Sequence, residues 1–422
     1  MGRRRSRFRG LWRRPEFLRL WGSLTVTSFG AQITNLALPL TGALLLHATA
    51  IQMGVLIALE ALPFALFSLF AGVLVDRMRK LPLIIGSNVA RGTALLLVPA
   101  AAWLDLLSMP LLYLVGFVCG IANVLGGAAY QVLLAQMAGR RRLVEANSKV
   151  ALGENAANLV GPGLAGGLIQ LVTAPFAILL DAASFLVSIL MLRRIKRHDV
   201  QPIAASGAAI GVWREIGEGL SLVRRNAILW SLAWTVALWQ LLHHMQMAVI
   251  ILFATRELGL SAGEIGLVFV FGGIGCLLAA ASAERLSARF GVGPVIMHGL
   301  VLTAVGWQIY GLVQRGMPGA TVALGMGFLL FDFGATLFGI NYLSLRQAIT
   351  PDRLLGRMTA TMRFLTVSVA PLGSLLGGVL GEWIGLRATL LTIGGLGLLL
   401  AAVVSGLSPL RRHRRLPAVS AP

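Results

Sequence analysis

Charged residues are scarce in this sequence of 422 residues, where Asp, Glu, Lys and Arg together make up 12%. Soluble domains carry about 25% charged residues, so this composition lacks the polar surface that a protein in water needs. Acidic residues are the scarcest, with 16 Asp and Glu against 36 Lys and Arg, while 57% of all residues are hydrophobic. The composition excludes an ordinary soluble domain and indicates a membrane protein.

The sequence also has few residues or motifs that could support catalysis. Its two cysteines, Cys119 and Cys276, lie inside apolar stretches, which excludes a secreted disulfide scaffold. It contains no GxxxxGK[ST] loop for ATP phosphates and no HExxH, GxSxG or CxxC motif. We therefore expect no enzyme activity, no cofactor and no resident metal.

Long apolar stretches are abundant, and a membrane-spanning helix needs about 20 such residues. These stretches show no alternation with a period of two residues, which excludes barrel strands, and in lipid the backbone must satisfy its own hydrogen bonds. The predicted fold is therefore an all-α polytopic membrane protein with twelve transmembrane helices. The predicted spans are 17–46, 50–75, 81–104, 108–138, 146–171, 174–195, 227–254, 262–288, 293–313, 318–348, 357–383 and 386–408.

Basic residues are distributed unevenly over the predicted loops. The loops on one side carry only Arg256, Arg315 and Arg387, and nearly all other Lys and Arg residues lie on the side of the two termini. Because loops rich in Lys and Arg stay in the cytoplasm, we expect both termini to be cytoplasmic. The basic arm is then expected to contact anionic lipid and not nucleic acid. The preference for Arg over Lys, with abundant Ala and Gly, is typical of a GC-rich bacterium, so we expect the bacterial cytoplasmic membrane.

One long interior loop divides the spans into two groups of six. Its second part has helical spacing with a single apolar face, which predicts an amphipathic helix along the cytoplasmic membrane surface. The predicted organisation is a basic arm at 1–16, a six-helix bundle at 17–195, a linker at 196–226, a second bundle at 227–408 and a basic tail at 409–422.

The two groups of spans resemble each other when the sequence is shifted by about 208–211 residues. Asp76-Arg77 then meets Glu284-Arg285, and Gly166-Gly167 meets Gly377-Gly378. Two six-helix halves of like topology predict parallel repeats around an axis along the membrane normal. In such an arrangement a substrate cavity lies between the halves near mid-membrane.

The loop after the second span, Gly72-x-Leu74-x-Asp76-Arg77-x-Arg79-Lys80, resembles the signature loop of the major facilitator superfamily. The variant seen here is similar to the branch that contains the enterobactin exporter and the macrolide efflux proteins. The segments 35–40 and 145–147 support this resemblance. It implies the twelve-helix major facilitator fold and a secondary transporter of small molecules.

The resemblance also implies a cytoplasmic gate at this loop, with Arg363 as a possible partner of Asp76 from the other half. The alternative is that these charges only determine topology. The gate candidates are Asp76, Arg77, Arg79, Lys80, Glu284, Arg285 and Arg363.

A Gly- and Pro-rich stretch in the fifth span resembles the motif of drug/proton antiporters, with Ala157 where a first Gly is expected and one extra residue before the last Gly pair. Small residues let another helix approach closely, so helix packing alone is the alternative. The eleventh span has a similar stretch. The helix-packing candidates are Gly161, Pro162, Gly166, Gly167, Gly373 and Gly377.

Ionisable residues inside spans are few, and each costs at least about 2.5–3.5 kcal/mol at mid-bilayer, so each faces a cavity or a partner. Arg91 is the basic residue deep in a span, and it either pairs with an acid or binds an anionic substrate group. A buried ion pair is the alternative role for every acid. The proton-coupling candidates are Glu60, Glu154, Asp181 and Asp332.

Polar residues on span faces predict the wall of the substrate cavity. His243 and His244 could also bind metal, but a metal site needs three or four ligands and no carboxylate or Cys accompanies them. The cavity candidates are Gln32, Asn35, Arg91, Asn123, Asn158, Gln240, His243 and Asn341.

These observations favour a monomeric exporter of an amphipathic or hydrophobic small molecule, such as a drug, siderophore or secondary metabolite. Alternating access would be driven by the proton gradient, so protons and membrane lipids are the other expected partners. One alternative is a transporter of lysophospholipid or another lipid on the same fold. A membrane sensor or assembly partner that has lost transport is a second alternative.

Overall fold

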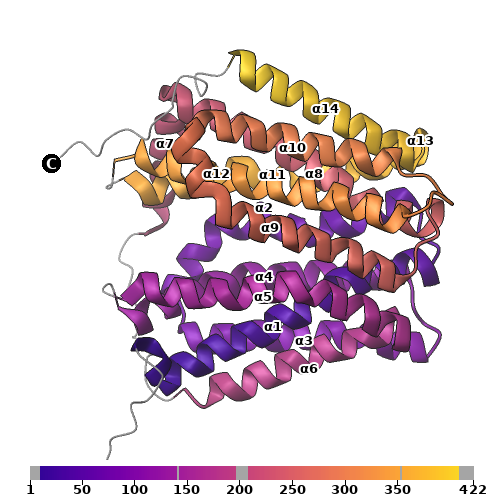
Figure 1. The fold of residues 1–422 in the computed structure, drawn as a ribbon. Helices are drawn as coiled ribbons and strands as arrows, with labels where there is room; N and C mark the ends of the chain where they lie inside the picture. The colour runs from indigo at the N-terminus through magenta and orange to yellow at the C-terminus, as the bar shows by residue number, and fades with distance from the viewer. Residues whose placement is uncertain (1–9, 140–141, 196–207, 352–353, 408–422) are drawn as a thin grey trace, which may run out of the picture.

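The computed structural model describes residues 10–139, 142–195, 208–351 and 354–407, with the backbone alone at 69–73, 76, 208–216 and 407. Within these residues the secondary structure is helical and contains no β-strand. Most helices lie side by side along one direction (Figure 1). The predicted all-α fold is confirmed.

The N-terminal half consists of the helices that precede the interior loop. In it α1 packs against α5 and α6, α3 packs against α4 and α6, and α2 packs against α4. Its elements are η1 (Gly10–Arg13), α1 (Pro15–Leu40), η2 (Thr41–Leu45), α2 (Ala50–Arg77), α3 (Lys80–Trp103), α4 (Met109–Ala138), α5 (Leu143–Val172) and α6 (Ala174–Arg193).

The C-terminal half repeats this packing, with α11 between α9 and α10 and with α14 against α8 and α10. Its elements are α8 (Ala227–Leu252), η4 (Phe253–Glu257), α9 (Ala262–Phe290), α10 (Val292–Leu312), α11 (Ala320–Ala348), α12 (Leu355–Val367), α13 (Ala370–Trp383) and α14 (Leu386–Leu407). The predicted eleventh span is thus two helices. Pro371 cannot donate a backbone hydrogen bond, which explains a break just before it.

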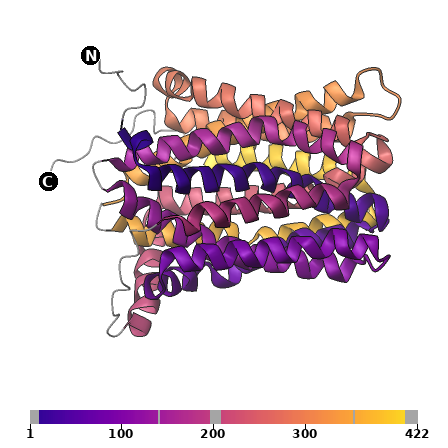
Figure 2. The same cartoon turned by 90° about the horizontal axis from the view of Figure 1, so that it is seen from below.

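The remaining helix, α7 (Ala208–Arg225), is the amphipathic helix predicted in the linker. It lies across the other helices at one end of the molecule (Figure 2), which we call the α7 end; the opposite end is the far end. In the part of the chain that the structure describes, α7 packs chiefly against α12, with further contacts to α8.

Ten helical segments among the described residues are long and apolar enough to cross a membrane, and they show a multi-pass membrane protein. The segments are α3, α4, α6, α9, α10, α11, most of α2, α8 with η4, α12 with α13, and most of α14. Two more helices, α1 and α5, have 26 and 30 residues and lie among the ten. They occupy the places of the other two predicted spans and carry several of the predicted cavity residues.

The two halves repeat at a constant interval along the chain. Each residue of the N-terminal half corresponds to the residue that lies as far after it as Ser261 lies after Thr49, and we call this correspondence the repeat register. Thr49 and Ser261 begin α2 and α9 with the same capping box, in which the side chain accepts from a backbone N–H one turn later. A π-helical turn precedes each box, at Thr41–Leu45 and Phe253–Glu257. Both pairs are separated by the same interval, which is slightly longer than the one expected from the sequence.

The repeat register corrects both predicted correspondences, and Gly166 corresponds to Gly378, one position later than predicted. Asp76 and Arg77 are the last two residues of α2. Their equivalents, Ala288 and Arg289, directly precede Phe290, the last residue of α9. Glu284 lies one helical turn earlier on α9. The predicted match rested on the shared sequence of an acid followed by Arg, and it was out of register by one helical turn.

The halves contact each other mainly through α2 with α13 and through α5 with α9. Both crossings place glycine against glycine backbone. A Cβ atom added at Gly378 would lie 2.7 Å from the carbonyl oxygen of Ala50 and 3.1 Å from the Cα of Gly54. A Cβ atom at Gly166 would lie 2.8 Å from the Cα of Gly266. No residue larger than glycine fits these positions without separating the helices.

The predicted packing residues differ in the helix that they contact. Gly166 and Pro162 meet α9, where a Cβ atom at Gly266 would lie 2.7 Å from the carbonyl oxygen of Pro162. Gly373 and Gly377 meet the backbone of α8 in the same way, and Gly161 meets Gln32 of α1. Gly167 has no heavy atom of another element within 4 Å of its added Cβ position.

The apolar core also joins the halves, and the residues that the N-terminal half contributes to it lie toward the far end. The largest cluster of buried residues includes Leu36 and Met53 from the N-terminal half and Val249 and Ile265 from the C-terminal half. Two smaller clusters of buried residues lie toward the α7 end, one in each half. The halves therefore share an apolar core toward the far end, and this core continues through the C-terminal half to Val223 of α7.

Replacing Gly166 by Ala tests the α5–α9 crossing. The added Cβ atom would lie 2.6 Å from the carbonyl oxygen of Ala262, and overpacking of this kind costs about 1–3 kcal/mol. We expect a lower unfolding temperature of the purified protein in detergent, measured by differential scanning fluorimetry. The matched control is Gly167→Ala, which adds a methyl group to open space. Equal unfolding temperatures for the two variants would contradict the assigned crossing.

Candidate functional site

A cavity of about 330 Å³ lies between the two halves, and we call it the central cavity. Helices α1, α2 and α5 of the N-terminal half face α8 and α9 of the C-terminal half across it. Its lining residues are Gln32, Asn35, Leu36, Pro39, Ile57, Glu60, Pro162, His243, His244, Met247, Ile250, Ile251 and Phe269.

The central cavity brings together residues that the sequence predicted on separate spans. Gln32, Asn35, Glu60 and His243 all line it. At its border, Gln32 Nε2 donates to Asn158 Oδ1 at 2.7 Å, which links α1 to α5. The wall is therefore apolar with a few polar groups, as is typical of small-molecule sites.

Glu60 is the acidic residue in this wall. Its side chain packs against Gly116 of α4, where an added Cβ atom would lie 3.0 Å from the Cγ of Glu60. No hydrogen bond or ion pair joins its carboxyl group to any residue that the structure describes. An unpaired carboxyl group is thus exposed to the cavity between the halves.

The C-terminal half contains a mirrored acid at the equivalent helix crossing. Gly272 of α9 corresponds to Glu60 in the repeat register and packs directly against the carboxyl group of Asp332 on α11. Asp332 in turn corresponds to Gly120 of α4, which packs against the backbone of Glu60. The acid and the glycine have exchanged helices between the halves, so each half has one carboxyl group at this crossing.

Two other predicted residues have internal partners instead. Asp181 is fully buried between α6 and α1 and accepts hydrogen bonds from Ser184, at 3.0 Å, and from Thr34. Asn341 is buried, accepts from Ser287 at 2.7 Å and donates to the carbonyl oxygen of Leu337 at 2.9 Å. Neither side chain lines the central cavity.

His243 belongs to an aromatic group that the sequence did not reveal. Its ring stacks on Trp239 at 5.2 Å and on Phe331 at 5.4 Å between ring centroids. Trp307 and Phe338 extend the group on the side away from the cavity. The four-residue spacing of Trp239 and His243 was the available signal, but their partners come from α10 and α11.

The other two polar residues singled out on α8 are His244 and Gln240, and they differ in their position relative to the central cavity. His244 lines the central cavity, and its Nδ1 lies 2.9 Å from the carbonyl oxygen of Gln240. The Gln240 side chain is not part of the lining. Among the described residues, no three His, Cys, Asp or Glu side chains gather where they could hold a metal ion.

A second cavity, of about 450 Å³, lies inside the N-terminal half, and we call it the N-half pocket. Predicted residues Arg91, Asn123 and Glu154 line it, so the structure divides the predicted cavity residues between two spaces. The full lining is Ser23, Leu24, Thr27, Ile84, Ser87, Asn88, Arg91, Ala122, Asn123, Gly126, Gly127, Tyr130, Gln131, Leu134, Asn147, Val150, Ala151 and Glu154.

The predicted gate residues lie at the α7 end. Arg77 and Arg79 are exposed where α2 ends and α3 approaches, whereas Lys80 is buried at the start of α3. Glu284 and Arg285 are exposed on α9.

The structure describes the side chain of Arg363 but not that of Asp76, its predicted partner. The guanidinium group of Arg363 lies 4.5 Å from the centre of the Phe64 ring on α2, three helical turns before Asp76. Arg363 thus contacts the other half through an aromatic ring, and its pairing with Asp76 stays a prediction.

At the far end, polar contacts to backbone groups join the halves. Arg256 of η4 donates to the carbonyl oxygen of Ala48 at 2.8 Å. Glu382 of α13 accepts from the backbone N–H of Ala50 at 3.0 Å, which places a carboxylate at the N-terminus of α2. Sequence reasoning treated Arg256 only as a loop charge, because its partners are backbone atoms that no sequence motif marks.

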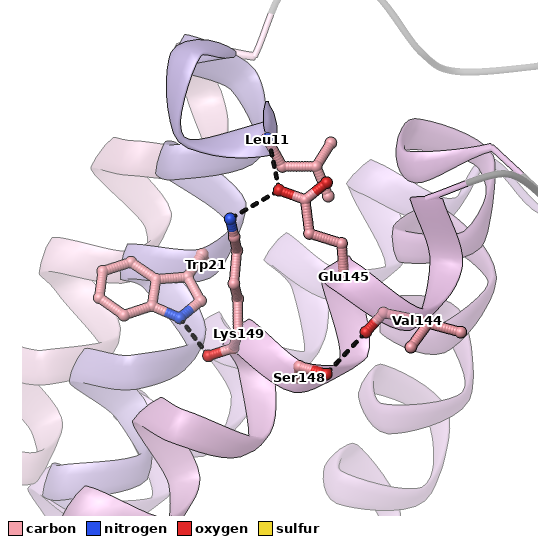
Figure 3. Close-up of polar contacts among 6 residues, drawn as sticks. All are labelled: Leu11, Trp21, Val144, Glu145, Ser148 and Lys149. Atoms are coloured by element: carbon pink, nitrogen blue, oxygen red, sulfur yellow. Dashed lines mark hydrogen bonds and ion pairs between the residues drawn. The ribbon is translucent and has the colours of Figure 1, made fainter. Parts of the chain in front are cut away.

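The start of the chain docks on α5 at the α7 end (Figure 3). Glu145 Oε1 accepts from the backbone N–H of Leu11 at 2.8 Å and from Lys149 Nζ at 2.7 Å. The Trp21 indole N–H donates to the carbonyl oxygen of Lys149 at 2.8 Å. The hydrogen bond from Lys149, followed by that from Leu11, lowers the pKa of Glu145. These bonds hold η1 and α1 against the start of α5.

The linker helix is attached to the C-terminal half. Glu218 of α7 forms an ion pair with Arg357 of α12. Gly219 lets the helices approach, since an added Cβ atom would lie 3.1 Å from the carbonyl oxygen of Arg357. The described part of α7 therefore packs on α12 as well as lying across the helix ends.

Comparison with known proteins gives consistent matches over nearly the whole chain. The family described as the Major Facilitator Superfamily matches residues 20–253 and 244–421. The multidrug efflux pump Tap of Mycolicibacterium fortuitum is 26% identical over 418 residues, which cover 97% of this chain and 99% of that protein. The enterobactin exporter EntS of Salmonella typhi is 23% identical over 401 residues, which cover 94% and 93%.

A solved structure shows the same fold. The nucleoside transporter NupG, as its D323A mutant, superposes with a TM-score of 0.75 at 12% identity and covers 92% of this chain and 98% of that chain. The family resemblance drawn from the loop after the second span, including the likeness to the enterobactin exporter, is confirmed.

Replacing Arg256 by Gln tests the closure of the far end. The variant loses the charged donor to the Ala48 carbonyl, so we expect the far ends of the two halves to separate more often. Spin labels can be attached at Leu106 and Met317, which are both exposed. Double electron–electron resonance spectroscopy should then report a longer or broader distribution of the distance between the two labels. The control is Arg387→Gln, because Arg387 pairs with Glu257 inside the C-terminal half. Unchanged distances in the Arg256 variant would refute this closure.

Replacing Glu145 by Gln tests the docking of η1. Because the pKa of Glu145 is lowered from 4.5 in the folded protein, its charge contributes stability above that value and loses the contribution as pH falls through the lowered pKa. At neutral pH we expect faster hydrogen exchange at Gly10–Arg13 in the variant, measured by mass spectrometry. The difference from the parent should vanish on acidification. The same substitution at Glu264 of the far end should leave this exchange unchanged.

Proposed function

Because this chain belongs to the Major Facilitator Superfamily, we propose that it is a secondary exporter that exchanges an amphipathic or hydrophobic small molecule for protons across a bacterial cytoplasmic membrane. The α7 end faces the cytoplasm in this proposal, with both termini on that side. The moving units are the bundles predicted at 17–195 and 227–408, joined by the linker at 196–226, with the arm at 1–16 and the tail at 409–422 beside the membrane. The protein acts as a monomer.

The unpaired carboxyl group of Glu60 is the observation that carries this proposal. An acid at membrane depth is costly unless it has a partner or a function. Glu60 has no partner among the described residues, and it faces the central cavity, where cargo and water can reach it. We assign to it the release and uptake of the exchanged proton.

Three observations support the direction and sidedness. The loops at the α7 end carry most of the basic residues, which are retained in the cytoplasm. The names of two relatives, a multidrug efflux pump and an enterobactin exporter, describe export. The glycine crossings and the Arg256 contact close the far end in this structure.

Alternating access follows from these contacts. In the state described, cargo enters the space between the halves from the α7 end while the far end is closed. Rocking of the halves then separates the α2–α13 and α5–α9 crossings and brings the α7 ends together. In the second state Asp76, Arg77, Arg79 and Lys80 form the gate with charged residues of the other half. Asp332 is the second proton-coupling candidate, because it occupies the mirrored crossing.

Replacing Glu60 by Gln tests the proposal. In energised inside-out vesicles a pH-sensitive dye would record proton release on addition of amphipathic drugs, siderophores or lysolipids. We expect a cargo-dependent signal in the parent and its loss in the Glu60 variant, which keeps the size of the side chain but cannot exchange a proton. Asp181→Asn, at an acid with internal hydrogen bonds, is the control and should retain the signal if it folds.

Each outcome has a defined meaning. Retention of proton release in the Glu60 variant would transfer the assignment to Asp332 or Glu154. Cargo movement that needs ATP and continues without a proton gradient would refute proton exchange. A response to lysolipids alone would replace the proposed cargo by lipid.

A further inference from the structure

The N-half pocket occupies a space that the C-terminal half fills with side chains. In the repeat register Thr27 corresponds to Trp239 and Gly126 to Phe338. The register is secure here, because Gly126 packs against Ser87 and Phe338 packs against Gly299, the equivalent of Ser87. Small residues in one half thus stand where large aromatic residues stand in the other.

The aromatic side chains of the C-terminal half fill the equivalent space, so the fold does not require a cavity at this place. Trp239, Trp307, Phe331 and Phe338 pack together with ring centroids 5.4 to 6.3 Å apart. The N-terminal half instead leaves about 450 Å³ open and lines it with amide, hydroxyl and charged groups. A polar hollow costs packing energy, so its retention in one half alone indicates a ligand.

The pocket contains a cation that forms no direct ion pair, although Asp181 lies close enough to attract it electrostatically. Among the described residues no ion pair joins Arg91, and its Nε is buried without a hydrogen-bond partner. Its guanidinium group lies 4.6 Å from the centre of the Phe185 ring. The nearby acid Asp181 directs its two carboxyl oxygens to Ser184 and Thr34. In the C-terminal half the residue equivalent to Arg91 is an uncharged threonine.

Hydrogen bonds hold neighbouring polar groups of the wall in place. Asn88 Nδ2 donates to Ser188 Oγ at 2.8 Å, and Ser188 shares a hydrogen bond of 2.6 Å with Ser23. These bonds fix α1, α3 and α6 around Arg91. A planar guanidinium group in a fixed wall suits a carboxylate, sulfonate or phosphate, which it binds through two parallel hydrogen bonds.

The pocket is reached between α4 and α5. Asn123 and Gln131 of α4, and Asn147 and Glu154 of α5, line the pocket and are exposed. The two helices make few contacts with each other. Cargo that enters between the halves from the α7 end therefore meets this opening.

We propose that the N-half pocket binds the acidic group of the cargo, with Arg91 as its counterion, so that the cargo is an amphipathic organic anion. This inference rests on the proposed function only in taking the bound molecule to be the cargo. Glu154 stands at the opening and opposes an incoming anion while it is ionised. Its removal therefore strengthens anion binding, whereas removal of Arg91 weakens it.

Two fluorescent probes test the inference on the full chain in nanodiscs of neutral lipid. Anilinonaphthalenesulfonate is an anion, and phenylnaphthylamine is the same ring system without the sulfonate. We expect Arg91→Met to weaken binding of the anion about tenfold or more, which is the size of effect of a charge-assisted contact. Binding of the neutral probe should stay unchanged, and Arg91→Lys should retain part of the affinity for the anion.

Matched variants keep the test decisive. Arg346→Met removes a buried Arg of the other half, which bonds to Tyr342, and should leave both affinities unchanged. Thr27→Trp introduces the equivalent residue of the C-terminal half and should block the anion by filling the pocket, even if the Arg91 variant does not fold. Glu154→Gln should bind the anion more tightly than the parent. Equal loss of both probes in Arg91→Met, or unchanged anion binding in Arg91→Met, would overturn the inference, and so would unchanged anion binding in Thr27→Trp.

The outcome is independent of proton exchange, because probe binding needs no gradient. Selective loss of anion binding together with absent proton release in vesicles would retain the pocket and refute the antiport. Normal antiport with unchanged anion binding in the Arg91 variant would retain the exporter and refute this cargo class.

Discussion

The close approach of glycine backbones at two helix crossings is the constraint on which the rest of the structure depends. Gly54 with Gly378, and Gly166 with Gly266, bring the halves into backbone contact. These contacts determine where the halves touch and where a space remains between them. The central cavity lies beside these crossings, so the closure of the far end and the position of Glu60 have a common origin.

Much of the fold could be predicted from the sequence because its signals are local. Hydropathy locates spans, since each helix must satisfy its backbone in lipid. The cost of a charge at membrane depth predicts a partner or a function for Glu60 and for Arg91 from the sequence alone. The spacing of small residues likewise predicted Gly166 as a packing position, because small residues matter only where helices meet closely.

The site was less predictable because it depends on helix rotation and on distant partners. A polar residue on a span does not reveal whether it faces a cavity or another helix, and Asp181 and Asn341 turned out to face helices. The stacking of Arg363 on Phe64 and the aromatic partners of His243 come from elements far apart in sequence. The repeat register follows from helix caps and helix ends, which the similar acid–Arg pairs at Asp76 and Glu284 do not reveal.

The constant interval of the repeat register has a consequence for the origin of the chain. Across the described helices neither half has gained or lost residues relative to the other, so their differences in shape arise from side-chain substitution. Each half presents the same two helices to its partner, one glycine on each, and is therefore complementary to a copy of itself. The single chain preserves the interface of a symmetric dimer, as expected after duplication of an ancestral six-helix protein, and the exchanged acid and glycine and the one-sided pocket mark where that symmetry was lost.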